Sequence, residues 1–197
     1  MDKGSNPQKD RMLAIAGVLF WKKGYEGTTM RDIARAYRCK PANIYNYFPS
    51  KEALLYEILR SQMEWIVSSI KDLEDDNQTP PVEQLRFLIE KHASFTLNYA
   101  KSSKLLFDVG LDSLSPANRK KIVKLRDTYD RILRKVIRRG IKSGDFARVD
   151  EKLAAYSIAS MIVRSLIWFS PEGKLSIPEI IDFIKNFALN GLSGKVG

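Results

Sequence analysis

A short run of small, amide and aromatic side chains around residue 43 has the chemistry to contact the edges of DNA bases. Ile44 and Phe48 are four positions apart, so a helix over residues 41–48 that buries both turns its other side chains outward. The outward set is Pro41, Ala42, Asn43, Tyr45 and Asn46. A small residue permits close approach to a major groove, an amide can pair with adenine, and an aromatic ring can meet a thymine methyl group.

A second helix, expected over residues 29–37, must hold this face in place. Thr29 and Asp32 fit a capping box, and an apolar stripe at helical spacing follows, formed by Met30, Ile33, Ala34 and Tyr37. Two short helices joined by the tight turn Arg38-Cys39-Lys40 make a helix-turn-helix arrangement. Tyr47 and Lys51 border the outward face. Lys51 begins the next helix, where a cation and free backbone N–H groups can hold phosphate.

The rest of the chain also reads as helix, because no segment sustains the two-residue alternation of a strand. Asn6-Pro7 starts a first helix that presents Leu13, Ala16, Gly17 and Phe20 on one face. We predict an all-α fold of nine helices, with a helix-turn-helix domain over residues 1–50 and a second helical domain over residues 51–197. The nine helices are expected at 7–23, 29–37, 41–48, 51–73, 82–100, 102–112, 116–143, 151–169 and 177–192.

Composition and charge exclude several classes of protein. With 44% hydrophobic residues over 197 positions the chain can bury a core, and its net charge of +10 favours an anionic partner. A single cysteine, Cys39, and a single histidine, His92, argue against a disulfide framework or a metal centre. We expect no catalytic residues, metal or cofactor. The chain shows no signal-peptide stretch and no membrane-spanning run, so we expect a cytoplasmic protein without a membrane partner.

Two stretches resemble the N-terminal signature of TetR-family transcriptional regulators. They are Gly24-Tyr25-Glu26-Gly27-Thr28-Thr29-Met30-Arg31-Asp32-Ile33-Ala34 and Ala42-Asn43-Ile44-Tyr45-Asn46-Tyr47-Phe48-Pro49-Ser50-Lys51-Glu52-Ala53-Leu54. The resemblance covers residues 9–55 without a gap. It implies an all-helical homodimer whose first three helices bind palindromic double-stranded operator DNA. Its C-terminal helices would hold an inducer pocket and the dimer interface.

Position by position, the resemblance assigns DNA contacts to residues of this chain. Bases would be contacted by Arg31, Pro41, Ala42, Asn43 and Tyr45, and phosphates by Thr29, Asn46, Tyr47 and Lys51. The turn departs from the family, which usually has Gly-Val followed by Ser or Thr. Here Arg38 must take the conformation that glycine usually supplies, and Lys40 replaces the hydroxyl cap while adding positive charge beside the groove.

The last two helices suggest a dimer interface. Helix 151–169 is apolar on most sides, so it is expected to be buried on more than one side, and helix 177–192 carries an isoleucine and phenylalanine stripe. Two such helices from each chain would form a four-helix interface about a two-fold axis. The alternative is a monomer in which the last helix simply covers the one before it.

An effector pocket is expected among the middle helices, and its lining residues would be Trp65, Phe95, Tyr99, Phe107, Tyr129, Met161, Arg164 and Trp168. Arg164 precedes Trp168 by one turn and would clamp an anion beside an aromatic platform. The alternative is an arginine that reaches the surface or pairs with Asp108 or Asp112.

The C-terminal region also resembles the branch of the family that controls lipid and steroid degradation, several members of which answer to acyl-CoA thioesters. The stretches that carry this resemblance are Gly144-Asp145-Phe146, Arg164-x-x-x-Trp168-Phe169, Pro171–Ser176 and Gly191-Leu192. The predicted protein is therefore a DNA-binding repressor released by a small lipophilic effector, such as an acyl-CoA, a neutral lipophile or an aromatic compound. The competing classes are an enzyme, a small-molecule carrier, and an adaptor that binds acidic proteins through helix 116–143. No Ser/His/Asp, paired-carboxylate or phosphate-loop pattern supports the enzyme.

Overall fold

The computed structural model describes residues 6–99 and 111–193, and within them the only secondary structure is helical. Two short 3-10 helices, η1 (Lys71–Glu74) and η2 (Leu111–Ser113), accompany the α-helices. The α-helices are α1 (Pro7–Lys23), α2 (Met30–Tyr37), α3 (Pro41–Tyr45), α4 (Lys51–Ile70), α5 (Pro81–Asn98), α8 (Pro116–Ser143), α9 (Glu151–Trp168) and α10 (Ile177–Leu192). The all-α class is confirmed. The described residues contain eight of the nine expected helices, and the expected helix 102–112 lies almost wholly outside them.

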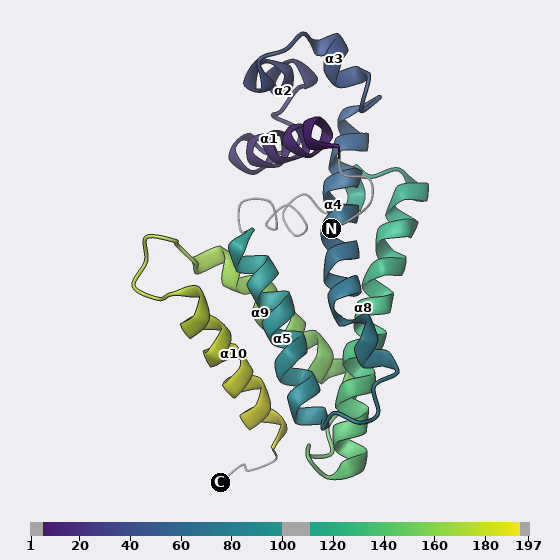
Figure 1. Cartoon of the computed structure of the whole chain (residues 1–197), viewed down its shortest axis with the longest axis vertical. Coiled ribbons are helices and arrows are strands. Elements are labelled where there is room, and N and C mark those ends of the chain that lie inside the picture. Colours follow the sequence, from purple (N-terminus) through teal and green to yellow (C-terminus); the bar gives the residue numbers. More distant parts are fainter. Residues whose placement is uncertain (1–5, 100–110, 194–197) are drawn as a thin grey trace. The chain divides into compact units, whose positions relative to one another are not determined.

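The chain forms two compact units. Met1–Met63 and Lys101–Val123 make the first, and Glu64–Ala100 and Lys124–Gly197 make the second, so α4 and α8 contribute to both. In the first unit α2 packs against α1 and α3, and in the second α5 packs against α9 and α10 (Figure 1). The expected functional division at residue 50 stays a prediction.

Side chains at helical spacing build the core of the first unit. Phe20, Ile33, Ile44 and Phe48 are all fully buried there, which confirms the faces expected for α2 and α3, except that Tyr37 at the end of the α2 stripe is only half-buried. On α1, however, Met12 is buried and Leu13 is only half-buried, contrary to expectation. Met12 lies four positions before Ala16 and eight before Phe20, so the buried side chains of α1 follow an i, i+4, i+8 stripe that Leu13 does not join.

Two helices end three residues earlier than the sequence predicts. The helix expected over residues 41–48 ends at Tyr45, because Pro49 disfavours helical geometry at Phe48. The helix expected over residues 51–73 ends at Ile70, where the chain tightens into η1. Both changes concern helix ends and leave the order of the elements unaltered.

The second unit is packed around α5. Leu85, Leu88 and Ile89 of α5 are completely buried, and so is Ile162 of α9. No helix of the described residues is long and apolar enough to cross a membrane.

Candidate nucleic-acid interface and effector site

A reciprocal cap starts α2 and orients its first turn. The Asp32 backbone N–H donates to the Thr29 hydroxyl oxygen over 3.1 Å, and the Thr29 backbone N–H donates to the Asp32 carboxylate over 3.0 Å. The Thr29 hydroxyl also donates to that carboxylate, which holds the pKa of Asp32 below its ordinary value. The expected capping box is confirmed. Arg31, the second residue of α2, is left exposed, as a base contact requires.

The turn after α2 takes the left-handed conformation that the sequence predicts. Arg38 has φ 62° and ψ 48°, and it is the non-glycine residue with positive φ in the described part of the chain. Its backbone N–H reaches the carbonyl oxygens of Ala34 and Arg35, and the Cys39 N–H donates to Ala34 over 3.0 Å. These bonds satisfy carbonyl groups at the end of α2, so the departure from glycine is accommodated. Lys40 precedes α3 without a side-chain cap, also as expected.

The α3 helix presents one continuous exposed face. Ile44 is 0% exposed and Phe48 1%, whereas the side chains between and before them point to solvent. The exposed set is Pro41, Ala42, Asn43, Tyr45, Asn46 and Tyr47. The outward orientation predicted from the spacing of Ile44 and Phe48 is therefore confirmed, while the base and phosphate contacts themselves stay predictions.

Two of the predicted phosphate ligands have partners that the sequence did not reveal. The Tyr47 hydroxyl donates to the Gln8 side-chain oxygen over 2.5 Å, which ties the end of α3 to α1. Lys51 Nζ donates to the Tyr25 carbonyl oxygen over 2.8 Å and lies 4.2 Å from the centre of the Tyr25 ring. Burial, together with Glu26 and Glu52, raises the pKa of Tyr25 to about 12. Lys51 Nζ also lies 3.6 Å from the exposed Glu26 carboxylate, so it joins α4 to the loop before α2. Its contact with phosphate stays a prediction.

In the second unit, three of the predicted effector residues form an aromatic ladder. The rings of Trp65 and Phe95 stack with centroids 4.5 Å apart, and the rings of Phe95 and Tyr99 are 5.0 Å apart. Phe95 is buried, whereas Trp65 and Tyr99 are exposed. The buried ring of Phe95 therefore lies between two exposed rings.

A fourth residue, Tyr129, has a polar partner that the sequence analysis did not identify. Its hydroxyl lies 2.7 Å from His92 Nδ1, and both side chains are buried. Burial lowers the pKa of His92 to about 4, so the imidazole is neutral at physiological pH. The signal that could have placed it inside is its helical spacing with Leu85, Leu88 and Ile89.

The remaining predicted effector residues belong neither to the aromatic ladder nor to the His92–Tyr129 pair. Arg164 and Trp168 both lie on the exposed side of α9, where the indole is 57% exposed. Met161 is half-buried and lines a groove of about 430 Å³ between α9 and α10. Phe107 lies outside the described residues, as does Asp108, one of the two acids weighed as partners of Arg164.

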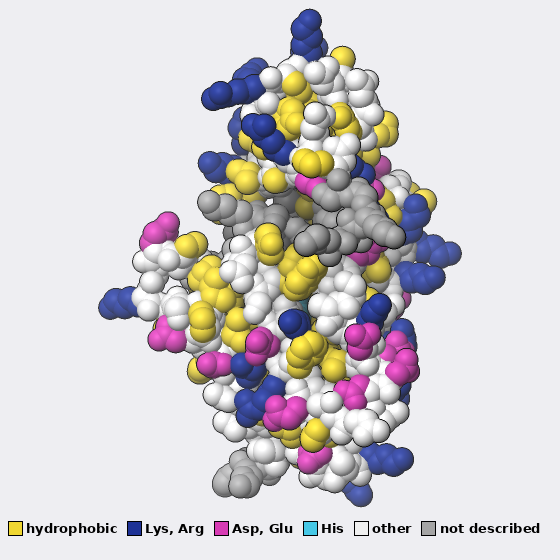
Figure 2. All heavy atoms as spheres, viewed as in Figure 1, with side chains coloured by type: hydrophobic (Ala, Val, Ile, Leu, Met, Phe, Trp, Pro, Cys, Tyr) yellow, Lys and Arg dark blue, Asp and Glu magenta, His cyan; other side chains and the backbone are white. Residues whose placement is uncertain are grey.

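One face of α9 and α10 is apolar and exposed in the single chain. Its members are Leu153, Tyr156, Ile167 and Trp168 of α9 and Phe183 and Phe187 of α10. Hydrophobic side chains are visible on the surface of this region in Figure 2. Phe183 is 67% exposed, and its ring stacks on Phe187 at 5.9 Å. This set, called the α9–α10 face below, is the surface that the dimer hypothesis needs.

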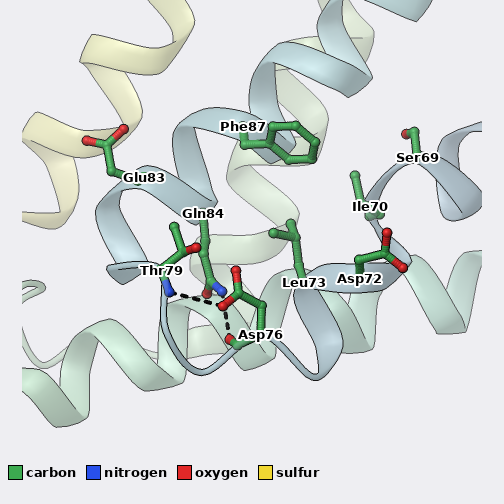
Figure 3. Close-up of a pocket in the computed structure, with 9 residues that line it drawn as sticks. All are labelled: Ser69, Ile70, Asp72, Leu73, Asp76, Thr79, Glu83, Gln84 and Phe87. Atoms are coloured by element: carbon green, nitrogen blue, oxygen red, sulfur yellow. Dashed lines mark hydrogen bonds between the residues drawn. The ribbon is translucent and has the colours of Figure 1, made fainter.

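A separate cleft of about 620 Å³ opens between η1 and the start of α5 (Figure 3). Ile70, Leu73 and Phe87 give it an apolar wall. Its Asp76 carboxylate accepts backbone N–H groups of Gln78 and Thr79, over 2.9 and 3.0 Å. The cleft contains none of the predicted effector residues. Over residues 6–99 and 111–193, no group of three or more His, Cys, Asp or Glu side chains could hold a metal ion.

Comparison with known proteins finds two family matches along the chain. Residues 13–58 match the family of bacterial regulatory proteins called tetR, and residues 78–192 match the tetracyclin repressor-like C-terminal domain. The chain is 26% identical over 201 residues to the HTH-type transcriptional repressor KstR2 of Mycolicibacterium smegmatis, covering 100% of this chain and 97% of that protein.

Solved structures agree in fold. PfmR, a TetR-family regulator from Thermus thermophilus, is 34% identical with a TM-score of 0.84, over 92% of this chain and 98% of its own. AibR, solved in complex with isovaleryl coenzyme A and operator DNA, is 25% identical with a TM-score of 0.82, over 91% and 97%. The helix-turn-helix geometry, the two family matches and these full-length similarities together show that the chain belongs to the TetR family of transcriptional regulators.

Proposed function

We propose that this protein is a cytoplasmic repressor that binds palindromic operator DNA as a homodimer and releases it when an acyl-CoA thioester binds. The observation that carries the DNA-binding part is the α3 face, where small, amide and aromatic side chains point outward over two buried anchors. A protein that only carries a small molecule, or an adaptor without DNA binding, has no use for such a face.

In this proposal α3 lies in the major groove. Asn43 and Tyr45 contact base edges, Arg31 reaches a base from the start of α2, and Lys51 holds a phosphate. A two-fold dimer that meets successive major grooves places its two α3 helices about 34–36 Å apart. Effector binding widens that spacing.

The α9–α10 face is the proposed dimer interface. Six large apolar side chains exposed on two adjacent helices are unusual for a surface that only meets water. Pairing of this face with a second copy buries them in a four-helix arrangement about a two-fold axis. At micromolar concentration we expect the molecular mass of a dimer in solution, and a strict monomer would contradict the proposal.

The effector is proposed to be an acyl-CoA. The similarity to AibR, whose solved structure contains isovaleryl coenzyme A, supports this class of ligand. The aromatic ladder of Trp65, Phe95 and Tyr99 suits an acyl chain. Arg164 supplies a planar fork for phosphate, and its exposure suits the polar end of the molecule.

The DNA-binding part is tested with promoter DNA from upstream of the gene and three variants. Asn43→Ala should lose discrimination at one or two base pairs. Lys51→Ala should weaken binding to all sequences alike and reduce the slope of log affinity against log salt concentration by about 2, because each dimer loses two phosphate contacts. Lys142→Ala is the matched control, because it removes an exposed charge from the C-terminal end of α8. Because Lys51 also donates a hydrogen bond to Tyr25, the thermal unfolding of the Lys51→Ala variant is measured as well, to verify that it is folded.

The effector part is tested by a thermal-shift screen of acyl-CoAs, free fatty acids and aromatic acids, followed by operator release with every hit. Arg164→Met should fold and bind operator like the wild type but fail to release it. Arg148→Met, which removes another exposed arginine of the same unit, should respond normally. If only uncharged lipophiles bind, the acyl-CoA proposal is wrong.

A further inference from the structure

We propose that the exposed basic residues Arg119, Lys120 and Lys121 at the start of α8 form a second DNA-contacting surface. This surface, called the α8 patch, would bind the phosphate backbone of duplex DNA outside the half-site held by α3. The inference rests on the proposed DNA-binding function. It adds a contact from a helix that lies far from the helix-turn-helix in the sequence.

The α8 patch belongs to the same compact unit as α1, α2 and α3. Its three side chains are exposed and follow one another without interruption. Behind them, Leu114 and Ile122 are buried, so this end of α8 is anchored in the unit rather than hanging in solvent. Cations held in fixed positions can each contact one of the regularly spaced phosphates of duplex DNA.

Hydrogen bonds attach the α8 patch to the first turn of α4. The Glu52 carboxylate accepts the Ser115 backbone N–H over 3.1 Å and the Asn118 side-chain amide over 2.9 Å. Further along, Lys121 Nζ lies 5.4 Å from the centre of the Tyr56 ring. The patch is thereby held beside the stretch of α4 that begins with Lys51.

Because an α-helix rises 1.5 Å per residue, Lys51 and Tyr56 are about 7.5 Å apart along the α4 axis. One strand of duplex DNA carries a phosphate for about every 3.4 Å of its axis. In this proposal the bound duplex continues past Lys51 alongside α4, which brings further phosphates within reach of the long lysine side chains at the patch. These phosphates lie on the flank of the half-site.

The charges of the α8 patch are only partly balanced within the protein. Arg119 pairs with Asp112 over 3.0 Å, but that carboxylate is itself highly exposed. In the parts of the chain that the structure describes, neither Lys120 nor Lys121 pairs with a carboxylate, and the first turn of α8 contains no acidic residue. Cations near a helix amino end oppose the helix dipole, so this placement weakens the helix. A bound polyanion would offset that cost.

The experiment compares operator duplexes of two lengths. The short one ends at the outermost base of the half-sites, and the long one continues for about one helical turn on each side. The affinity of the wild type, the double variant Lys120→Gln with Lys121→Gln, and the control Lys142→Gln is measured over a salt series. Thermal unfolding verifies that each variant is folded.

On the long duplex the double variant should bind at least about tenfold more weakly than the wild type. For the double variant, the slope of log affinity against log salt concentration should be smaller by about 3 to 4, because four lysines per dimer no longer contact phosphate. On the short duplex the double variant and the wild type should bind alike, and Lys142→Gln should match the wild type on both.

Equal binding of wild type and double variant to the long duplex overturns the inference, and would leave the patch to a different partner such as an acidic protein. An equal loss on both duplexes also overturns it, because the effect would then be general. Failure of the wild type to bind even the short duplex would instead refute the proposed function itself.

Discussion

Replacing Arg38 by glycine should make the protein more stable and a weaker DNA binder at the same time. Arg38 has φ 62° and ψ 48°, a left-handed conformation in which a side chain crowds the following carbonyl group. Glycine has no Cβ and adopts this conformation without strain. The hydrogen bonds that close the turn start from backbone N–H groups, so the substitution keeps them.

Two opposing terms set the magnitude. The left-handed conformation costs an L-residue roughly 1–2 kcal/mol, which Arg38→Gly recovers. Glycine gains more freedom in the unfolded chain, which offsets about 0.5–1 kcal/mol of that recovery. The net increase in the free energy of unfolding is therefore about 0–1.5 kcal/mol, with a midpoint of about 0.8 kcal/mol. For a chain of this size, the midpoint raises the melting temperature by about 2–3 °C and the upper limit by up to about 6 °C.

The assay pairs urea unfolding with operator binding at fixed protein concentration. Arg38→Ala is the matched control, because it removes the same charge but retains a Cβ in the left-handed conformation. Both variants should lose DNA affinity to the same extent, through the lost positive charge beside the groove. Only Arg38→Gly should gain stability. Equal stability of the two variants would refute the argument from backbone strain.

Three further predictions concern the second unit. Gly140→Ala should lower the free energy of unfolding by about 1–3 kcal/mol in urea titration, because a Cβ there would overlap the Phe146 ring. Burial lowers the pKa of His92 from 6.5 to about 4, so the unfolded state binds its proton first. Wild-type stability should therefore fall as the pH drops from 6.5 towards 4, and less steeply in His92→Gln. Hydrogen bonds from two arginines lower the pKa of Glu151 from 4.5 to about 2, so its contribution should be present above pH 4.5 and lost towards pH 2. Glu151→Gln should remove that part of the acid sensitivity measured by circular dichroism.

The first three helices could be predicted from sequence because short-range physics decides them. The cap at Thr29, the left-handed turn at Arg38 and the burial of Ile44 and Phe48 each involve residues a few positions apart. Helix periodicity sets which side chains share a face, and the cap and turn residues set where each helix begins and ends. The exposed α3 face follows from these local rules alone.

The arrangement around the effector site depends on contacts that no local pattern encodes. Trp65 and Phe95 are thirty positions apart and stack, and His92 and Tyr129 are thirty-seven apart and share a hydrogen bond. Periodicity gave each of them a helix face but not a neighbour, because the neighbour depends on how whole helices pack. The sequence therefore indicated a set of candidate residues without dividing it into separate clusters.

Arg164 shows the same division most clearly. Its sequence context, an apolar helix with an indole one turn later, predicted an anion clamp beside an aromatic platform in an effector pocket. The structure leaves Arg164 and Trp168 exposed in the single chain, on the helix that contributes to the α9–α10 face. Sequence alone determined that α9 is helical and apolar on most sides, since composition and spacing decide that. Only the tertiary structure decided which of those sides α5 and α10 cover, because burial is a property of the partner helices as much as of the helix itself.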